Sequence, residues 1–450
     1  MTFNSAGFPL VFLVLFLAYF GLGSRHRTRL SLLLAGNLLF YATWSVSFVP
    51  YLLATGIFDF LIARAIDRMG SPRKRAVVLG LSMGANLGML FVFKFLDPLL
   101  SALPGHSPFG LVAPLGISFY TFQSMSYTID VYRRVCRPKA SLLEFLASLT
   151  FLPHMLAGPI IRASFFLPQF ERLRTPTEGQ LRRGCVLIAI GLFKKSLADL
   201  AGPIVQTYYD FNGSLGPLPA WTGALAFATQ VYGDFSGYSD MASGLAWLLG
   251  FELPPNFQLP YLSRSPMEFW RRWHISLSTW FRDYVFYPLA IGPLRRHVYF
   301  NLFLVMVLAG VWHGAGWNFF LFGVYHGLLL AGAQWLSTRT GRRAPFPPVV
   351  QIALTFYLVL LGQAVFRVPL AHLPAVFRGL HFLSVGTRPV SPVTFFAMIA
   401  ALLVGHGVDF QVAKRRNAEL SPRFAYTVSI AAFAFALFAG TPAKFIYFKF

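Results

Sequence analysis

Residues 7–23 read GFPLVFLVLFLAYFGLG, an apolar run without a charged side chain. A helix that crosses a membrane needs about 20 mostly apolar residues. Similar runs recur along the chain, at 30–44, 46–66, 76–96, 111–131, 142–160, 184–209, 219–250, 298–315, 317–336, 347–366, 391–410 and 424–441. Some of them are too short or too interrupted by Pro and Gly to span. The pattern therefore predicts an all-α polytopic membrane protein with about 10–12 transmembrane helices.

The composition favours a membrane protein over a basic soluble one. The 450 residues carry a net charge of +22, yet only 12% are charged and 56% are hydrophobic. A soluble domain usually carries about twice that charged fraction. Nucleic-acid binding needs a basic face on a polar surface, so no nucleic-acid partner is expected. No repeat or long linker divides the chain, which predicts one domain over residues 1–450.

The basic residues gather in alternate short loops. Residues 25–29, 73–75 and 133–139 are rich in Lys and Arg, whereas 97–110 and 212–219 contain neither. This alternation is typical of membrane proteins whose basic loops stay in the cytosol. It places the N-terminus outside. The run 142–160 is interrupted by proline and glycine, and we expect it to be re-entrant.

A polar stretch interrupts the apolar pattern in the second half of the chain. Asp234 and Asp240 lie in an otherwise apolar segment. Burying an ionisable side chain inside a membrane costs free energy, so each such residue is a candidate functional residue. The alternative is that both carboxylates bond backbone groups freed by Gly233, Gly237 and Gly244.

A helix with a clear start follows. Ser265, Pro266 and Glu268 form a capping box with Pro at the first helical position. Helical spacing predicts that one face is apolar, with Phe269, Trp270, Trp273, Leu277, Trp280, Phe281 and Tyr284. The opposite face carries Arg271, Arg272, Ser278 and Arg282. Such a helix should lie in the membrane plane with its aromatic side chains in the lipid. The arginines then contact either lipid headgroups or a phosphorylated donor.

Two histidines are candidates for chemistry. His313 lies within AGVWHGAGWN (309–318), deep in an apolar run, and a histidine can move protons near neutral pH. The neighbouring Gly310 and Gly314 allow close approach of a ligand or of another helix. The alternative for His313 is a buried packing residue. His274 lies at the edge of the apolar face. Without other information, a histidine in this position is more often a packing residue than a catalyst. No metal site is expected, since the histidines lack ligand spacing with carboxylates or cysteines.

Several long segments resemble the membrane-bound O-acyltransferase (MBOAT) family, in particular its alginate O-acetyltransferase type. They read PLGISFYTFQSMSYTIDVYRR (114–134), FLPHMLAGPIIR (151–162), QVYGDFSGYSDMASG (230–244), PPNFQLPYLSRSPMEFWRRWHISLSTWFRDYVFYPL (254–289), GVWHGAGWNFFLFGVYHG (310–327) and FIYFKF (445–450). At 289–295 the chain reads LAIGPLR, where alginate-type members usually carry a GGNR-like turn. That departure leaves the acceptor open.

The resemblance implies a bundle with re-entrant and interfacial helices around a central funnel or tunnel, with a catalytic core at about 111–336. It implies transfer of an acetyl group from a cytoplasmic thioester such as acetyl-CoA, with no bound cofactor. The acceptor would be a hydroxyl of an extracytoplasmic polysaccharide, such as alginate or a related exopolysaccharide. The implied setting is the bacterial inner membrane, with membrane lipid and a periplasmic acetyltransferase-like protein as partners.

The resemblance implies roles for two histidines, and the chemistry of other residues suggests roles beside them. His313 matches the family's invariant histidine and is expected to act as general base or proton shuttle. His274 matches its second recurring histidine and is expected to orient the donor or to stabilise developing charge. Three arginines are expected to hold donor phosphates: Arg271, Arg272 and Arg282. Five further residues are expected to support the cavity: Asp234, Tyr238, Asp240, Trp312 and Asn318.

Two alternatives to acetyl transfer remain. One is D-alanyl transfer to teichoic acid, which is an acyl transfer of the same general kind. The other is a non-enzymatic transporter or channel, because broken helices and intramembrane aspartates also fit that class.

Overall fold

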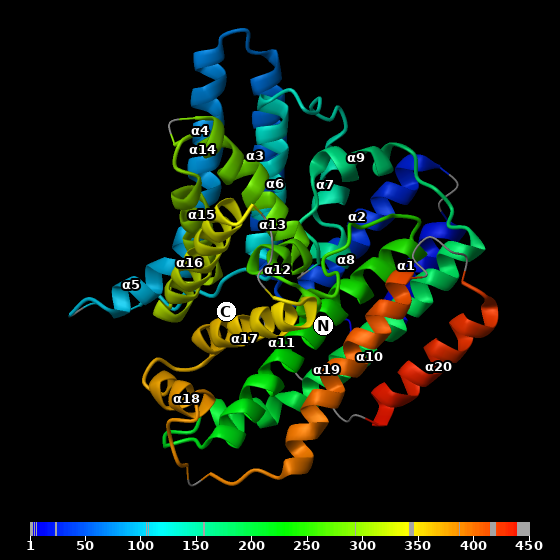
Figure 1. Cartoon of the computed structure of the whole chain (residues 1–450). Helices are drawn as coiled ribbons and strands as arrows, with labels where there is room; N and C mark the ends of the chain where they lie inside the picture. Colours follow the sequence, from blue (N-terminus) through cyan, green and yellow to red (C-terminus); the bar gives the residue numbers. More distant parts are fainter. Residues whose placement is uncertain are drawn as a thin grey trace. The chain divides into compact units, whose positions relative to one another are not determined.

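The computed structural model consists of helices and the segments that connect them (Figure 1). It describes residues 3, 5, 7–22, 25–104, 106, 108–155, 158–292, 294–341, 346–386, 388–414 and 420–438. No β-strand occurs in these ranges, which confirms the predicted all-α class. Contacts divide the chain into two units. Unit 1 comprises Met1–Ile188 and Tyr238–Pro254, and unit 2 comprises Ala189–Gly237 and Pro255–Phe450.

Two long helices belong to both units, because the boundaries fall inside them. They are α10 (Glu178–Tyr209) and α11 (Pro217–Leu248). The remaining helices of unit 1 are α1 (Phe8–Gly21), α2 (His26–Ala42), a 3₁₀ turn (Val46–Phe48), α3 (Val49–Arg68), α4 (Pro72–Phe91), a π-helical turn (Val92–Leu96), α5 (Asp97–Ser101), α6 (Ile117–Tyr132), α7 (Leu142–Leu149), α8 (Leu152–Met155) and α9 (Ala163–Glu171).

Unit 2 holds the helices of the second half of the chain. They are a 3₁₀ turn (Pro260–Leu262), α12 (Pro266–Arg272), α13 (Ile275–Phe281), a π-helical turn (Arg282–Phe286), α14 (Tyr287–Ile291), α15 (Val298–His313), α16 (Trp317–Arg339), α17 (Pro348–Arg367), α18 (Leu373–Leu380), α19 (Pro392–Lys414) and α20 (Pro422–Phe438). Proline stands in the first turn of α3, α4, α12 and α17, where its missing N–H has no helical partner to lose.

Within the described ranges, five helical segments are long and apolar enough to cross a membrane. They are Val46–Arg68, Pro72–Ser101, Trp317–Arg339, Pro348–Arg367 and Pro392–Lys414, and three shorter apolar helices accompany them. This number is lower than the predicted 10–12. The runs at 111–131 and 142–160 form only the 16-residue α6 and the short α7 and α8. Neither α7 nor α8 can span, and the re-entrant path of this run stays a prediction.

A buried aspartate holds three helices of unit 1 together. Asp59 of α3 is fully buried and accepts hydrogen bonds from Ser82 Oγ of α4 at 2.7 Å and from Ser124 Oγ of α6 at 2.6 Å. The Nδ2 group of Asn86 lies 3.0 Å and 3.1 Å from the two carboxylate oxygens. The three helices pack side by side (Figure 1). Because side-chain donors surround this carboxylate, it is a structural cross-link in an apolar surrounding.

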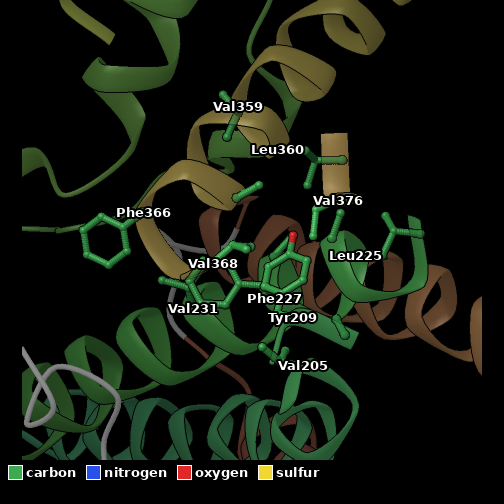
Figure 2. Close-up of a cluster of buried hydrophobic side chains, with 14 of the residues drawn as sticks. Val205, Tyr209, Leu225, Phe227, Val231, Val359, Leu360, Phe366, Val368 and Val376 are labelled. Carbon is green, nitrogen blue, oxygen red and sulfur yellow. The ribbon is translucent and has the colours of Figure 1, made fainter. Parts of the chain in front are cut away.

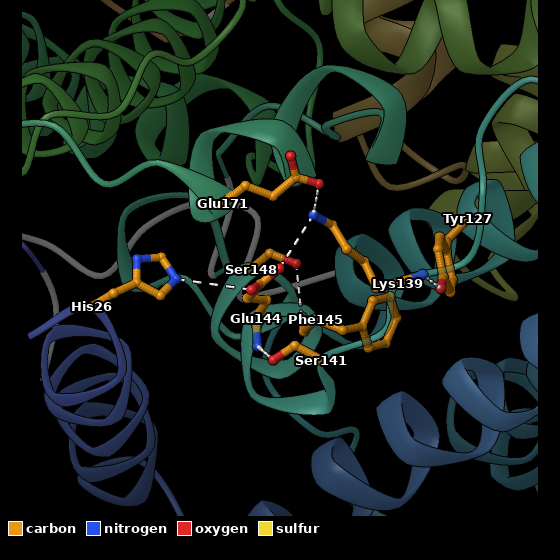
Figure 3. Close-up of polar contacts among 8 residues, drawn as sticks. All are labelled: His26, Tyr127, Lys139, Ser141, Glu144, Phe145, Ser148 and Glu171. Carbon is orange, nitrogen blue, oxygen red and sulfur yellow. Dashed lines mark hydrogen bonds and ion pairs between the residues drawn. The ribbon is translucent and has the colours of Figure 1, made fainter.

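A second polar cluster of unit 1 fixes one of the basic loops. Figure 3 shows Lys139 between two carboxylates: its Nζ lies 3.2 Å from Glu144 Oε2 of α7 and pairs with Glu171 of α9. The backbone N–H of Lys139 donates to the hydroxyl of Tyr127 at 2.9 Å. Ser141 caps α7 by accepting the N–H of Glu144 at 3.3 Å. Lys139 is therefore an internal anchor of the loop 133–141 and not part of its exposed charge.

Aliphatic and aromatic side chains fill the core of unit 2. Figure 2 shows how α10, α11, α17 and α18 meet there. The labelled members are Val205, Tyr209, Leu225, Phe227, Val231, Val359, Leu360, Phe366, Val368 and Val376. Phe227, Val231, Val359 and Phe366 also line a pocket described below, so this core forms part of the pocket wall.

Glycines bring α10 and α11 into close contact in unit 2. A Cβ added at Gly233 would come within 2.6 Å of the Lys194 carbonyl oxygen, and one at Gly237 within 2.6 Å of the Gly191 carbonyl oxygen. Small residues four apart typically allow such an approach in membrane helices. Both glycines remain inside a continuous helix, so they free no backbone groups for nearby carboxylates.

Buried lysines of α10 pair with the carboxylates of unit 2. Lys195 Nζ lies 3.0 Å from Asp234 Oδ1 and also pairs with Asp199. The helix is not broken beside Asp234, and one partner of this carboxylate is a lysine on the adjacent helix. Lys194 Nζ lies 2.7 Å from Asp409 Oδ1, which ties α19 to α10.

Candidate active site

The predicted helix through residues 265–284 is not continuous. The capping box at its start is confirmed, since Ser265 Oγ accepts the N–H of Glu268 at 3.2 Å. However, α12 ends at Arg272 and α13 begins at Ile275. Between them His274 adopts the left-handed conformation, with φ 44° and ψ 53°. A non-glycine residue rarely takes this conformation, and such strained positions are concentrated at functional sites.

Hydrogen bonds from a distant segment explain the break. In a continuous helix the N–H of Ser276 would donate to the carbonyl of Arg272. Instead, the N–H of Gln258 donates to that carbonyl at 2.9 Å, and Ser276 N–H donates to Asn256 Oδ1 at 3.2 Å. The N–H of Ile275 donates to the Asn256 carbonyl at 2.9 Å. The extended segment before the 3₁₀ turn therefore replaces one helical turn, and Asn256 is its central residue.

The aromatic face of this region is inside the protein and not in the lipid. Phe269, Trp273 and Leu277 are 3%, 7% and 2% exposed, and they line an internal pocket. Trp280 and Phe281 are buried as well. The expectation of aromatic side chains lying in the membrane is therefore wrong for these residues, because α12 packs against α16 and α17.

His313 is placed by a tight helical hairpin. It is the last residue of α15, and α16 starts at Trp317 and packs along α15 (Figure 1). A Cβ at Gly310 would come within 2.4 Å of the Phe319 carbonyl oxygen. Gly310 therefore allows close approach of another helix, which is one of the two roles considered for it, the other being close approach of a ligand. The His313 side chain is buried, with its ring 5.1 Å from that of Phe366.

A single pocket of unit 2 brings the two predicted histidines together. Its empty space of about 500 Å³ includes open solvent at its mouth. His274 and His313 line it together with His326 of α16 and Gln363 of α17. The Trp312 ring lies 6.3 Å from the His274 ring and 4.9 Å from the His313 ring. Gln363 lies beyond the expected catalytic core of 111–336.

The hydrogen bonds of His274 fix which nitrogen carries its proton. Asn256 Oδ1 accepts from Ser276 N–H and from Ser276 Oγ–H at 2.8 Å, so this oxygen is an acceptor. His274 Nδ1, 3.2 Å from the same oxygen, must therefore be the donor. In the neutral ring Nε2 then carries a lone pair. This nitrogen is buried and has no hydrogen-bond partner among the described residues.

Burial also determines the charge of His274. The loss of solvation, together with the neighbouring His313, lowers the pKa of His274 well below 6.5. The ring is therefore neutral at physiological pH. A neutral ring whose only N–H is bonded to Asn256 can accept a hydrogen bond, but it offers no N–H to a developing oxyanion.

A third histidine of the pocket was missed by the sequence analysis. His326 is 2% exposed, and its Nδ1 accepts the indole N–H of Trp270 at 3.3 Å. The neutral ring therefore carries its proton on Nε2. The sequence does contain a pattern that could have identified His326. It is followed by Gly327 just as His313 is followed by Gly314, and the two His-Gly pairs lie on adjacent helices of one hairpin.

The three arginines proposed for donor binding lie apart from the described pocket lining. Arg272 pairs with Glu268 at 2.5 Å, and Arg282 pairs with Asp283 at 2.7 Å. The side chain of Arg282 is half exposed, and Arg271 is exposed. The Arg272–Glu268 pair is half-buried and the Arg282–Asp283 pair is more open. Ion pairs that solvent reaches are weak, about 0–1 kcal/mol, so they can open to an anionic ligand.

The residues expected to support the cavity fall into both units. Asn318 joins the start of α16 to the end of α17, because its Nδ2 donates to the carbonyls of Val365 at 2.7 Å and Val368 at 2.6 Å. Asp234 and Trp312 also belong to unit 2. Tyr238, which stacks on Phe3, and the half-buried Asp240 belong to unit 1.

One known protein family matches the part of the chain that holds this pocket. The model of the membrane-bound O-acyltransferase family matches residues 133–367, a range that includes all three pocket histidines and Gln363. The chain belongs to this family. It is a multi-pass membrane enzyme that transfers acyl groups to hydroxyls, which decides against a non-enzymatic transporter.

Several known proteins are similar to this chain over more than half of its length. The chain is 38% identical over 401 residues to a probable alginate O-acetylase of Pseudomonas putida, covering 85% of this chain and 80% of that protein. It is 32% identical to a peptidoglycan O-acetyltransferase of Helicobacter pylori, with 82% and 77% covered. It is 29% identical to a teichoic acid D-alanyltransferase of Bacillus subtilis, with 63% and 75% covered.

Proposed function

We propose that this enzyme moves an acetyl group from a cytoplasmic thioester, acetyl-CoA, to a hydroxyl of an extracytoplasmic polysaccharide such as alginate or a related exopolysaccharide. The observation that carries the proposal is the pocket lined by both His313 and His274, whose Nε2 has no hydrogen-bond partner among the described residues. Higher identity and wider coverage favour the O-acetyl branch over D-alanyl transfer to teichoic acid. The proposed setting is the inner membrane of a bacterium, with a periplasmic acetyltransferase-like partner.

The proposed reaction is one acyl transfer. The acceptor oxygen attacks the thioester carbonyl carbon, a C–O bond forms, and the C–S bond breaks to release the thiol. His313 takes the hydroxyl proton as the C–O bond forms and passes it to the leaving sulfur. General-base assistance of this kind contributes about 10²–10⁴-fold to the rate.

His274 is proposed to orient the acceptor and not the donor. Its Nε2 can accept a hydrogen bond from an acceptor hydroxyl beside the one that reacts. A low pKa suits this role, because the ring keeps its lone pair and does not compete with His313 for the proton. Arg271, Arg272 and Arg282 remain the proposed contacts for donor phosphates, with lipid headgroups as the alternative.

We expect labelled acetyl groups to pass from acetyl-CoA to alginate in an alkali-labile ester when the full-length chain is present. The assay uses solubilised membranes of a Pseudomonas putida strain without its own alginate O-acetylase, with deacetylated alginate, peptidoglycan and teichoic acid offered separately. A second arm replaces the three arginines by glutamine, which should raise the KM for acetyl-CoA about tenfold through lost charge-assisted hydrogen bonds.

The outcomes separate the alternatives. Labelling of teichoic acid from a D-alanyl carrier, with none of alginate or peptidoglycan, would contradict the acetyl proposal. An unchanged KM for acetyl-CoA in the glutamine variant assigns the arginines to lipid headgroups. Glutamine at Arg295, an exposed arginine outside the three, provides the matched control.

The acid dependence of acceptor binding tests the role of His274. The acceptor lone pair on Nε2 is present above the pKa of His274 in the folded protein and is lost as the pH falls through it. Because this pKa is lowered well below 6.5, the KM for the polysaccharide should stay constant between pH 6 and 8. Asn256→Asp places a carboxylate beside Nδ1, favours the charged ring, and should raise this KM below about pH 7.

The control for this experiment is the KM for acetyl-CoA, which should follow the same pH profile in wild type and Asn256→Asp. The role of His274 would be refuted if the KM for the polysaccharide rose steeply below pH 7 in the wild type as well. An equal KM for the two proteins at every pH would refute it too.

A further inference from the structure

The amide of Gln363 has a fixed orientation in the pocket. Its Nε2 donates to the hydroxyl oxygen of Tyr261 at 2.8 Å. Tyr261 O–H in turn donates to the Ala228 carbonyl at 3.0 Å. A phenol has one proton, so its oxygen must accept from Gln363, and the amide cannot be turned around. Oε1 is therefore left as the free end of the amide.

This oxygen is an unsatisfied acceptor. Gln363 is 7% exposed and lines the pocket, and its Oε1 is buried without a hydrogen-bond partner among the described residues. Buried polar atoms are nearly always paired, and leaving one unpaired is costly. An unsatisfied oxygen that the local hydrogen bonds hold in one orientation is therefore suited to a ligand.

The pocket offers two acceptors of this kind. His274 Nε2 is the second, and its lone pair is fixed by an independent hydrogen bond to Asn256. Neither atom can pair with a thioester carbonyl, an oxyanion or an ionised phosphate, because both sides would then be acceptors without a hydrogen to share. Both atoms match O–H donors. These two atoms therefore match the hydroxyl-bearing substrate and not the thioester carbonyl itself.

We propose that Gln363 is an acceptor-binding residue whose Oε1 receives a hydrogen bond from a hydroxyl of the saccharide. The ligand class is a polyhydroxyl sugar unit with at least one hydroxyl besides the one acylated. Gln363 and His274 then hold neighbouring hydroxyls, and their positions determine which hydroxyl reaches His313. This inference rests on the proposed polysaccharide acetyl transfer and adds to it a residue that selects the site of acylation.

Tyr261 is a positioning residue in this arrangement. It contacts the far end of the Gln363 amide and does not line the pocket as described. Removing its hydroxyl lets the amide turn, so acceptor binding should weaken without any loss of a pocket-lining atom. This gives a second variant that tests the same role.

The test compares Gln363→Met and Tyr261→Phe with wild type in solubilised membranes that contain the full-length chain. Initial rates are measured for acetyl transfer to deacetylated alginate oligosaccharides and for acetyl-CoA hydrolysis without acceptor. The KM for the oligosaccharide should rise about tenfold in Gln363→Met and about threefold in Tyr261→Phe, as expected for one lost neutral hydrogen bond and one loosened. The KM for acetyl-CoA and the hydrolysis rate should stay within about twofold.

A matched control uses the same helix. Gln351→Met changes a glutamine of α17 that bonds the Phe346 carbonyl and lies outside the described pocket lining, so it should behave as wild type. Magnetic resonance of the product should show acetyl groups spread over more hydroxyl positions in Gln363→Met.

The possible failures differ from one another. If wild type acetylates alginate and Gln363→Met has an unchanged KM for the oligosaccharide, the role of Gln363 is overturned. A rise confined to the KM for acetyl-CoA overturns it as well, because the residue would then serve the donor. If Gln363→Met does not fold, an unchanged oligosaccharide KM in Tyr261→Phe decides against the role. If wild type acetylates no saccharide, the proposed function itself fails.

Discussion

Replacement of His313 by alanine is expected to abolish acetylation of the polysaccharide, with a fall of about 10²–10⁴-fold in the transfer rate. The reason is the position of the ring, which lines the same buried pocket as the bare Nε2 of His274 at the end of α15. The measurement is transfer of label from acetyl-CoA to alginate by membranes that contain equal amounts of each variant.

The matched control is His297→Ala. His297 is exposed and precedes the first residue of the same helix, so its loss should leave the rate unchanged. Equal membrane yield and an equal melting temperature in detergent show that His313→Ala is folded. Normal acetylation by a folded His313→Ala protein would remove this residue from the mechanism.

Replacement of Lys195 by methionine is expected to lower the free energy of unfolding by about 3–5 kcal/mol, the usual cost of leaving a buried charge without its partner. The Lys195 side chain is 5% exposed and lies between the carboxylates of Asp199 and Asp234. The side chain of Asp234 is only 3% exposed, so water cannot replace the lost ammonium. Unfolding is followed by circular dichroism in detergent.

A second substitution provides the internal check. Adding Asp234→Asn to Lys195→Met removes one of the two carboxylates that pair with Lys195 and should restore part of the lost stability. Lys74→Met, at an exposed lysine of α4, serves as the control and should change stability little. A loss below about 1 kcal/mol in Lys195→Met would mean that this ion cluster does not stabilise the fold.

The sequence predicted the elements whose signals are local. Apolar runs predicted the all-helical membrane class, and the Ser265 capping box correctly placed the start of α12. The motifs around His274 and His313 led to two residues that do line one pocket. In each case the information lies within a few residues, in apolar composition, in a cap, or in a short motif.

Other features depend on contacts between distant residues, and the sequence pattern did not reveal them. Helical spacing predicted one helix through 273–274, but Asn256, 18 residues before His274, takes over the hydrogen bonds that such a helix needs. The aromatic face was predicted to contact lipid because a helical wheel shows only that a face is apolar. It cannot tell whether that face packs against protein or against lipid. Gln363 lies in an apolar helix without a motif, and only its bond to Tyr261 reveals its role.

The length of α11, which is not among the five candidate spans, restricts how this helix can lie relative to a bilayer. At 1.5 Å per residue, its 32 residues extend about 48 Å, whereas the hydrocarbon layer is about 30 Å thick. Such a rod cannot be both upright and confined to the hydrocarbon; it must lean strongly or extend past a surface. Asp234 is its eighteenth residue, near the midpoint, so the ionic pairing with Lys195 lies about 25 Å along the rod from its first residue.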